Sequence, residues 1–160
     1  MANFIYDSLL NICKKNENNW KIIEQLKNEY IHLLSFLTNT PNISSEQFIN
    51  QINEISKIGD IIICYFINTE NHQLTIIGSG TIIYEPKIIH GCRNVGHIED
   101  IVVHNDYRSQ GIAKNILDKL IGSANKKDCY KVILDCKSEL ISFYEKNGFQ
   151  YNCNQMTKYF

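Results

Sequence analysis

Apolar residues in the first third of the chain recur at spacings of three and four, the pattern of a helix with one buried face. The pattern predicts a first helix from about 18 to 37, with these residues on its apolar stripe: Trp20, Ile23, Leu26, Tyr30, Leu33, Leu34 and Leu37. Pro41 ends that helix, and the capping sequence from Ser44 to Gln47 predicts the start of a second one. Its inward positions are Phe48, Ile49, Ile52 and Ile55. Phe4-Ile5-Tyr6 is the sole short candidate for a strand before these helices.

The pattern then changes to short runs of β-branched and aromatic residues, which predict strands. Ile61–Ile67 and Leu74–Tyr84 should form a hairpin around the polar loop 68–73, with interruptions at Gly78 and Gly80. The rest predicts a strand His97–Val103, a helix from Ile112 to about Asn125, a strand Lys131–Cys136, a helix Ser138–Asn147 closed by Gly148, and strand composition over Phe149–Phe160. This order predicts a mixed sheet with helices packed on its faces.

Composition limits the possible functions. With 160 residues, 44% of them hydrophobic, the chain suits one compact domain over 1–160. The formal charge of −1 offers no general attraction for nucleic acid or an anionic membrane. The start lacks a basic segment followed by an apolar one, and no apolar run approaches the roughly 20 residues that span a bilayer, so we expect a cytoplasmic protein.

The six cysteines, Cys13, Cys64, Cys92, Cys129, Cys136 and Cys153, show no C-x-x-C pair and no zinc-site spacing with histidine. We expect reduced, mostly buried thiols and no metal.

The segment Arg108-Ser109-Gln110-Gly111-Ile112-Ala113-Lys114 lies between a buried strand and an amphipathic helix. Gly111 has no Cβ and lets the backbone approach a ligand, while the free amides of the first helical turn favour an anion. A pyrophosphate would fit there. The alternative is that Gly111 only eases a strand-to-helix turn.

This segment matches the R/Q-x-x-G-x-G/A signature with which the GNAT superfamily binds the pyrophosphate of coenzyme A, and the chain resembles that superfamily from roughly Ile61 to its end. Within it, the chain resembles the glucosamine-6-phosphate N-acetyltransferases, on the segments Lys87–His90, Gly96–Val103, Cys129–Cys136 and Phe143–Phe149. The first 55 residues resemble that family only in their helical pattern.

The resemblance implies an α+β fold of GNAT type: a central mixed, mostly antiparallel twisted sheet with helices on both faces and a splayed parallel strand pair at the cofactor site. It implies acetyl transfer from acetyl-CoA, as cosubstrate, to the amine of glucosamine 6-phosphate by direct attack in a ternary complex, a step of UDP-N-acetylglucosamine biosynthesis. It also implies a homodimer whose C-terminal strands cross between subunits and help to complete each active site.

The resemblance further assigns site residues on β-strand positions. Adjacent Glu99 and Asp100 point to opposite faces of a strand unless a bulge intervenes, and the family has such a bulge. Both would then hold the sugar's amine and hydroxyls, while the backbone of Ile101, Val102 and Val103 binds the acetyl carbonyl and pantetheine arm, with Ile101 also lining the sugar site. The alternative for the acidic pair is a solvated pair of charges at a strand end.

Two residues carry the proton and orientation chemistry. Asp135 lies at the end of its strand and can orient the amine, although it could instead cap the following helix. Tyr144 can contact the cofactor and give a proton to the coenzyme A thiolate, although it could instead be a core aromatic beside Phe143. Glu99, Asp135 and Tyr144 are therefore the predicted catalytic residues.

The sugar phosphate requires cations, and the family brings Lys87, His90 and Lys131 together around the sugar, with Tyr130 beside them. Thr38 and, in a less certain register, Lys158 are further substrate contacts by resemblance; the alternative for each lysine is a solvated surface position. Two rival functions stay open: a GNAT enzyme for another amine, such as a protein lysine, polyamine or aminoglycoside, and a non-catalytic coenzyme A sensor.

Overall fold

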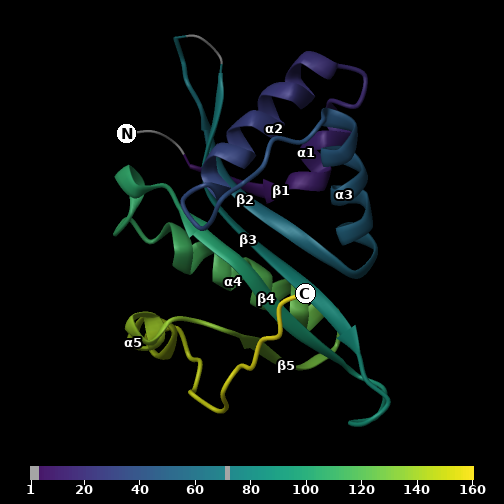
Figure 1. The fold of residues 1–160 in the computed structure, drawn as a ribbon, viewed down its shortest axis with the longest axis vertical. Coiled ribbons are helices and arrows are strands. Elements are labelled where there is room, and N and C mark those ends of the chain that lie inside the picture. Colours follow the sequence, from purple (N-terminus) through teal and green to yellow (C-terminus); the bar gives the residue numbers. More distant parts are fainter. Residues whose placement is uncertain (1–3, 71–72) are drawn as a thin grey trace.

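The computed structural model describes residues 4–70 and 73–160, which form one five-stranded sheet with helices on both sides (Figure 1). Along the chain the elements are β1 (Ile5–Ser8), α1 (Leu9–Lys15), α2 (Trp20–Leu34), α3 (Ser45–Ile58), β2 (Gly59–Ile67), β3 (Leu74–Pro86), β4 (Asn94–Val103), η1 (Asn105–Tyr107), α4 (Ile112–Lys126), β5 (Cys129–Leu134), η2 (Ser138–Leu140) and α5 (Ile141–Lys146). Residues 1–3 and residues 71–72, which belong to the predicted loop 68–73, lie outside the described residues. No helix among the described residues is long and apolar enough to cross a membrane.

The strands follow their sequence order across the sheet, β1-β2-β3-β4-β5. The first three pairings are antiparallel and the pairing of β4 with β5 is parallel. This arrangement confirms the α+β class and the mixed, mostly antiparallel sheet, including the hairpin of β2 with β3.

The core divides into two apolar clusters, one on each face of the sheet. The first lies beneath α1, α2 and α3, and its members include Leu9, Ile23, Leu33, Phe48, Ile63 and Val102. The second lies beneath α4 and also takes in α5, with Ile82, Ile98, Ile116, Leu120 and Tyr144 among its members. In Figure 1 the N-terminal helices and α4 accordingly lie on opposite sides of the strands.

The N-terminal region holds more structure than its pattern predicts. The strand candidate Phe4-Ile5-Tyr6 becomes β1, and the short helix α1 was not predicted. The first predicted helix is α2, shorter at both ends than 18–37; Trp20 is 58% exposed because it begins the helix, beyond the covered face. The capping box of α3 is confirmed, since the Ser44 side chain accepts from the Gln47 amide and the Gln47 side chain accepts from the Ser44 amide.

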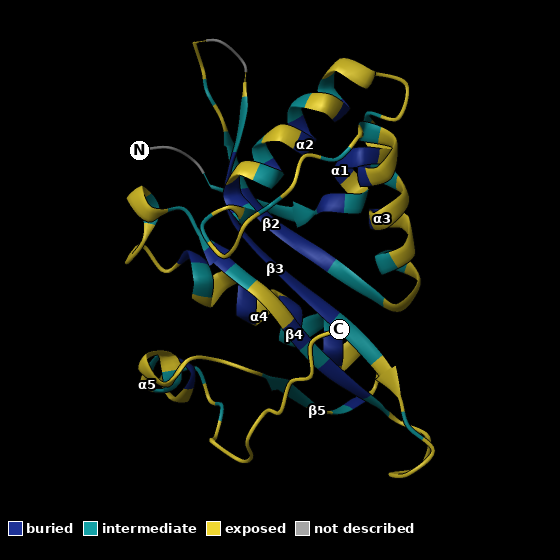
Figure 2. Cartoon of the chain, viewed as in Figure 1, coloured by how far each residue is buried: buried dark blue, intermediate teal, exposed yellow. Residues whose placement is uncertain are grey.

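The predicted strand over Phe149–Phe160 is wrong for this chain on its own. Residues 149–160 have no strand structure, and Figure 2 shows the segment from 150 onward as exposed. A segment with strand composition becomes a strand only when another strand pairs with its backbone, and no described segment does so here. The helix Ser138–Asn147 is confirmed as η2 followed by α5, and Gly148 follows it with φ +86°.

All six cysteines are free, as expected, but only Cys13, Cys64 and Cys129 are buried. The expectation of mostly buried thiols is therefore only half right. Cys92, Cys136 and Cys153 are exposed because they lie in turns and loops outside the strands and helices.

Candidate active site

A β-bulge interrupts the pairing of β3 with β4. Ser79 pairs with Val102 and Thr81 pairs with Glu99, so that Asp100 and Ile101 together face Gly80. Asp100 adopts a positive φ of 54°, a conformation that L residues seldom take. The bulge that the family resemblance implies is therefore present, and it lies directly at the acidic pair.

The bulge places Glu99 and Asp100 on the same face of β4. Ile98 and Ile101 both pack into the cluster beneath α4, so the two residues between them project toward the opposite face. The negative charge of Asp100 also helps to raise the pKa of Tyr30, which lies on α2 on that opposite face. The pair lies within β4 and not at its end, but both residues are exposed, so their substrate roles stay predictions.

Buried hydroxyl groups support the bulge from the side of α2. Ser79 and Thr81, the residues of β3 on either side of Gly80, are 0% and 6% exposed. The Ser79 hydroxyl donates to the Tyr30 hydroxyl at 3.3 Å. Burial, and secondly the charge of Asp100, raises the pKa of Tyr30 to about 12, so this phenol stays protonated.

The parallel strands β4 and β5 separate immediately before the acidic pair of Glu99 and Asp100. Their pairing ends where Ile98 faces Leu134, and the chain then leaves β4 toward α5 (Figure 1). The following stretch of β4, residues 99–103, has no β5 partner in the described structure. This is the splayed parallel pair that the resemblance implies, and it leaves the backbone of Ile101, Val102 and Val103 without a strand on that side.

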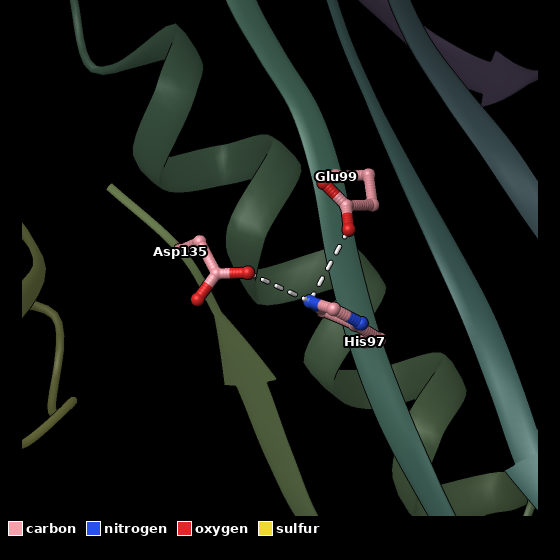
Figure 3. Close-up of side chains that lie close together, drawn as sticks. All are labelled: His97, Glu99 and Asp135. Atoms are coloured by element: carbon pink, nitrogen blue, oxygen red, sulfur yellow. Dashed lines mark ion pairs between the residues drawn. The ribbon is translucent and has the colours of Figure 1, made fainter. Parts of the chain in front are cut away.

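Three titratable side chains meet at the point of separation (Figure 3). His97 Nε2 lies 3.2 Å from Glu99 Oε1 and 3.5 Å from Asp135 Oδ2. His97 shares a face with Glu99 because it is two residues before it on β4, and the parallel register sets Ile133 of β5 beside it. No role for His97 is predicted from the sequence, although its two-residue spacing from Glu99 indicates that both side chains lie on one face of the strand.

The same three residues, His97, Glu99 and Asp135, could also bind a metal ion. Their ligand atoms lie within 4.8 Å of one another, a spacing that a metal ion could also use. The sequence predicts no metal, and the group is equally suited to hold a proton between an imidazole and two carboxylates.

Asp135 does not cap the following helices, which excludes the alternative reading of this residue. The N-cap positions of η2 and α5 are Lys137 and Leu140, neither with a side-chain cap. Instead, the Asp135 carboxylate faces His97 and accepts a hydrogen bond of 3.0 Å from Gln155 of the C-terminal segment.

Tyr144 is 8% exposed and its ring packs edge-on against Phe143 and Phe149, at 5.0 and 5.8 Å between centroids. It is thus a core aromatic as well as a candidate acid. Burial, and secondly the nearby Cys136 thiol, raises the pKa of Tyr144, which keeps the hydroxyl protonated at neutral pH.

The turn before α4 is open to solvent. Gly111 is its N-cap residue with φ +78° and ψ 3°, and a Cβ there would meet nothing within 4 Å. In the described structure no side chain caps the amides of α4. Arg108, Ser109 and Gln110 are exposed, and Ala113 is half-buried. The Ile112 side chain is buried, so only its backbone can face a ligand. Lys114 Nζ forms an ion pair with Asp118 at 2.6 Å.

Tyr130 brings two of the three predicted cations together. The His90 ring stacks on it at 4.2 Å between centroids, and Lys131 Nζ lies 5.7 Å from its ring centre. Lys87 is in the same region but forms an ion pair with Glu85.

Thr38 and Lys158 lie apart from the group around Tyr130 in the described structure. Thr38 is exposed in the turn after α2, where its amide donates to the Leu34 carbonyl, and Lys158 lies over the Phe160 ring in the exposed C-terminal segment. Their substrate roles stay predictions.

Comparison with known proteins agrees with this geometry. A model of the acetyltransferase (GNAT) family matches residues 29–149. The chain is 36% identical to glucosamine 6-phosphate N-acetyltransferase of Arabidopsis thaliana over 138 residues, which cover 86% of this chain and 92% of that protein. It is 37% identical to the enzyme of the same name from Candida albicans over 123 residues, covering 77% of this chain and 81% of that protein.

Solved structures give the same result. The crystal structure of glucosamine-6-phosphate N-acetyltransferase from Arabidopsis thaliana superposes with a TM-score of 0.81 at 30% identity, covering 99% of each chain. A Trypanosoma brucei acetyltransferase superposes with a TM-score of 0.79 at 30% identity, covering 99% of this chain and 100% of that one. The chain therefore belongs to the acetyltransferase (GNAT) family and, within it, to the glucosamine 6-phosphate N-acetyltransferases.

Proposed function

We propose that this protein transfers the acetyl group of acetyl-CoA to the 2-amine of D-glucosamine 6-phosphate by direct attack in a ternary complex. The products are N-acetylglucosamine 6-phosphate and coenzyme A, which places the reaction in UDP-N-acetylglucosamine biosynthesis. The observation that carries the proposal is the bulge, which turns Glu99 and Asp100 to one face where β4 separates from β5. A cytoplasmic location and the absence of nucleic-acid and membrane partners remain predictions from the sequence.

The residues around the start of α4 suit the pyrophosphate of acetyl-CoA. The uncapped amides after Gly111 offer donors and the positive end of the helix dipole, and the open space beside Gly111 allows close approach. The unpaired backbone of residues 101–103 would hold the pantetheine arm and acetyl carbonyl. The cosubstrate supplies an activated acyl group, and these residues supply its position.

The acidic face suits an amine. Glu99 and Asp135 would attract and orient the sugar's ammonium group, and Asp100 would bind its hydroxyls. The hydroxyl of Tyr144 would donate a proton to the departing thiolate, and its raised pKa keeps that proton available throughout the neutral range.

The group around Tyr130 suits a phosphate. His90 and Lys131 both lie against its ring, so the imidazole and the ammonium group would lie close together at the end of β5 away from Asp135. Lys87 would join them by exchanging its pairing with Glu85 for the phosphate.

The exposed C-terminal segment suits a second copy of the chain. Tyr151, Met156, Tyr159 and Phe160, which are interspersed with polar residues, are all largely exposed, and a group of exposed apolar side chains can mark a protein–protein interface. We propose a homodimer in which this segment pairs with the partner and brings Lys158 toward a sugar site. Light scattering after gel filtration should give twice the chain mass at micromolar concentration; the mass of a single chain would contradict the dimer.

Release of coenzyme A thiol from acetyl-CoA tests the function, with glucosamine 6-phosphate and unphosphorylated glucosamine compared at equal concentrations. We expect kcat/KM for the phosphorylated sugar to be at least tenfold higher, the effect of one lost charge-assisted contact of about 1.4 kcal/mol. Equal rates would contradict the phosphate site and favour another amine. Turnover with neither sugar, together with tight coenzyme A binding, would favour the sensor.

A further inference from the structure

The acidic face holds one titratable group that the proposed function does not yet use. The His97 side chain is 31% exposed, yet its Nε2 atom is buried and, among the described residues, has no hydrogen-bond partner. The distances of 3.2 and 3.5 Å to Glu99 and Asp135 are short enough for contact, but neither has hydrogen-bond geometry. A buried polar atom left in this way calls for an explanation, and a role in proton transfer is one.

The chemistry of the amine requires such a group. Two carboxylates stabilise the ammonium form of the sugar and so oppose the loss of its proton. Only the neutral amine has the electron pair that attacks the thioester. A proton acceptor must therefore act beside the carboxylates, and imidazole is the side chain whose charge ordinarily changes between about pH 5 and 8.

We infer that His97 is the final acceptor of the ammonium proton, which reaches Nε2 through the carboxylate of Glu99 or Asp135. An N–H bond of the ammonium breaks and its electron pair stays on the nitrogen. The proton passes to a carboxylate oxygen and then forms the N–H bond of an imidazolium held between two carboxylates. The imidazolium then returns the Nε2 proton to water through the exposed carboxylate of Glu99, which restores the neutral ring. Amide formation releases a second proton from the nitrogen, which restores the hydroxyl of Tyr144 after it has protonated the thiolate, so one proton leaves per turnover and no further reactant is needed.

His97 receives the proton through these carboxylates and does not touch the substrate itself, so it is a positioning residue. This inference rests on the proposed function. Each neighbouring strand contributes a further charged group to this face. By strand alternation they are Asp100 on β4, Glu85 on β3 and Lys131 on β5. Glu85 pairs with Lys87 and Lys131 lies over Tyr130, while the C-terminal segment contributes the neutral Gln155 next to Asp135.

The test is the pH profile of kcat at saturating sugar, for the wild type and for His97→Gln. Glutamine keeps a polar group near the position of Nε2 but cannot take the proton. We expect wild-type kcat to fall as the pH is lowered, because a protonated ring cannot accept the proton, and His97→Gln to lose this acid limb together with about 100-fold of kcat at pH 7.5. KM for acetyl-CoA should be unchanged, because His97 lies away from the turn before α4.

His32→Gln is the matched control, since His32 is exposed on α2 and should leave both the profile and kcat unchanged. Melting temperatures show whether each variant folds, and His97→Ala with added imidazole should regain part of its kcat. A His97→Gln variant with kcat within about twofold of wild type and the same acid limb would overturn the inference, because a merely structural role is restored by glutamine. Activity lost with EDTA and restored by a divalent metal would also overturn it. A wild type that fails to acetylate the sugar would instead refute the proposed function itself.

Discussion

Gly80 provides a direct test of the bulge. A Cβ at this position would lie 2.4 Å from Ile101 Cδ1, 2.8 Å from Ile116 Cγ2 and 3.0 Å from Leu120 Cδ1. All three atoms belong to buried or half-buried side chains between the sheet and α4. Gly80→Ala therefore forces Ile101, one of the two bulge residues, to move.

The expected magnitude follows from these contacts. Inserting a methyl group into a packed core costs about 1–3 kcal/mol, which lowers the melting temperature of a domain of this size by roughly 2–12 °C. The backbone of Ile101 is also proposed to position the acetyl carbonyl. A displacement approaching 1 Å there would lower kcat/KM by up to about 100-fold.

Urea unfolding and coenzyme A thiol release would measure the two effects. Ile101→Val removes the Cδ1 atom, so the double variant should regain part of the stability and activity that Gly80→Ala loses. Gly122→Ala is the control: Gly122 lies within α4 with nothing near a Cβ, and alanine should stabilise it by about 0.5–1 kcal/mol. The reasoning is refuted if Gly80→Ala is as stable and active as the wild type, or if Ile101→Val recovers neither property.

Further predictions concern single side chains. Because folding raises the pKa of Tyr30 from about 10 to about 12, its contribution to stability is complete below pH 10 and is lost, by roughly 2–3 kcal/mol, as pH rises through 12. In urea unfolding, the difference in free energy of unfolding between wild type and Tyr30→Phe should therefore be constant below pH 10 and fall above it; a difference that does not change with pH would contradict this role. Tyr144→Phe should lower kcat by about 100-fold or more while the melting temperature changes little; a kcat within threefold of wild type would exclude the acid role. Lys131→Ala should raise KM for glucosamine 6-phosphate about tenfold but leave glucosamine kinetics unchanged, whereas Lys21→Ala, at an exposed position on α2, should change neither; equal effects on both sugars would argue against a phosphate contact.

Most of the fold could be predicted because each long element buries one face. The stripe of α2, the capping box of α3 and the apolar runs of β2 and β3 each leave a local signal. By contrast, α1 has seven residues, too few to show a helical period, and strand composition after Phe149 does not reveal whether a partner strand exists.

The site could be predicted where motifs are local. The turn at Gly111 and the acidic pair at Glu99 are each a short continuous segment of the sequence. The acidic pair lies where β4 separates from β5, and the turn lies before α4, as the motifs predict. The two-residue spacing of His97 from Glu99 is a local signal, but the approach of Asp135 to His97 could not be predicted. It depends on the parallel register that sets Ile133 beside His97 and on the departure of Asp135 from β5. Such long-range pairing has no signal in a short segment.

Nuclear magnetic resonance of the product tests the central claim most directly. The protein would be incubated with glucosamine 6-phosphate and acetyl-CoA labelled with ¹³C at the acetyl carbonyl. We predict one labelled acetamide on the 2-amine of the sugar for each coenzyme A thiol released, and about one hundredth as much or less after Tyr144→Phe over the same initial interval. Thiol release without a labelled sugar amide, or a label found on oxygen, would contradict the claim that this bulged acidic face acetylates an amine.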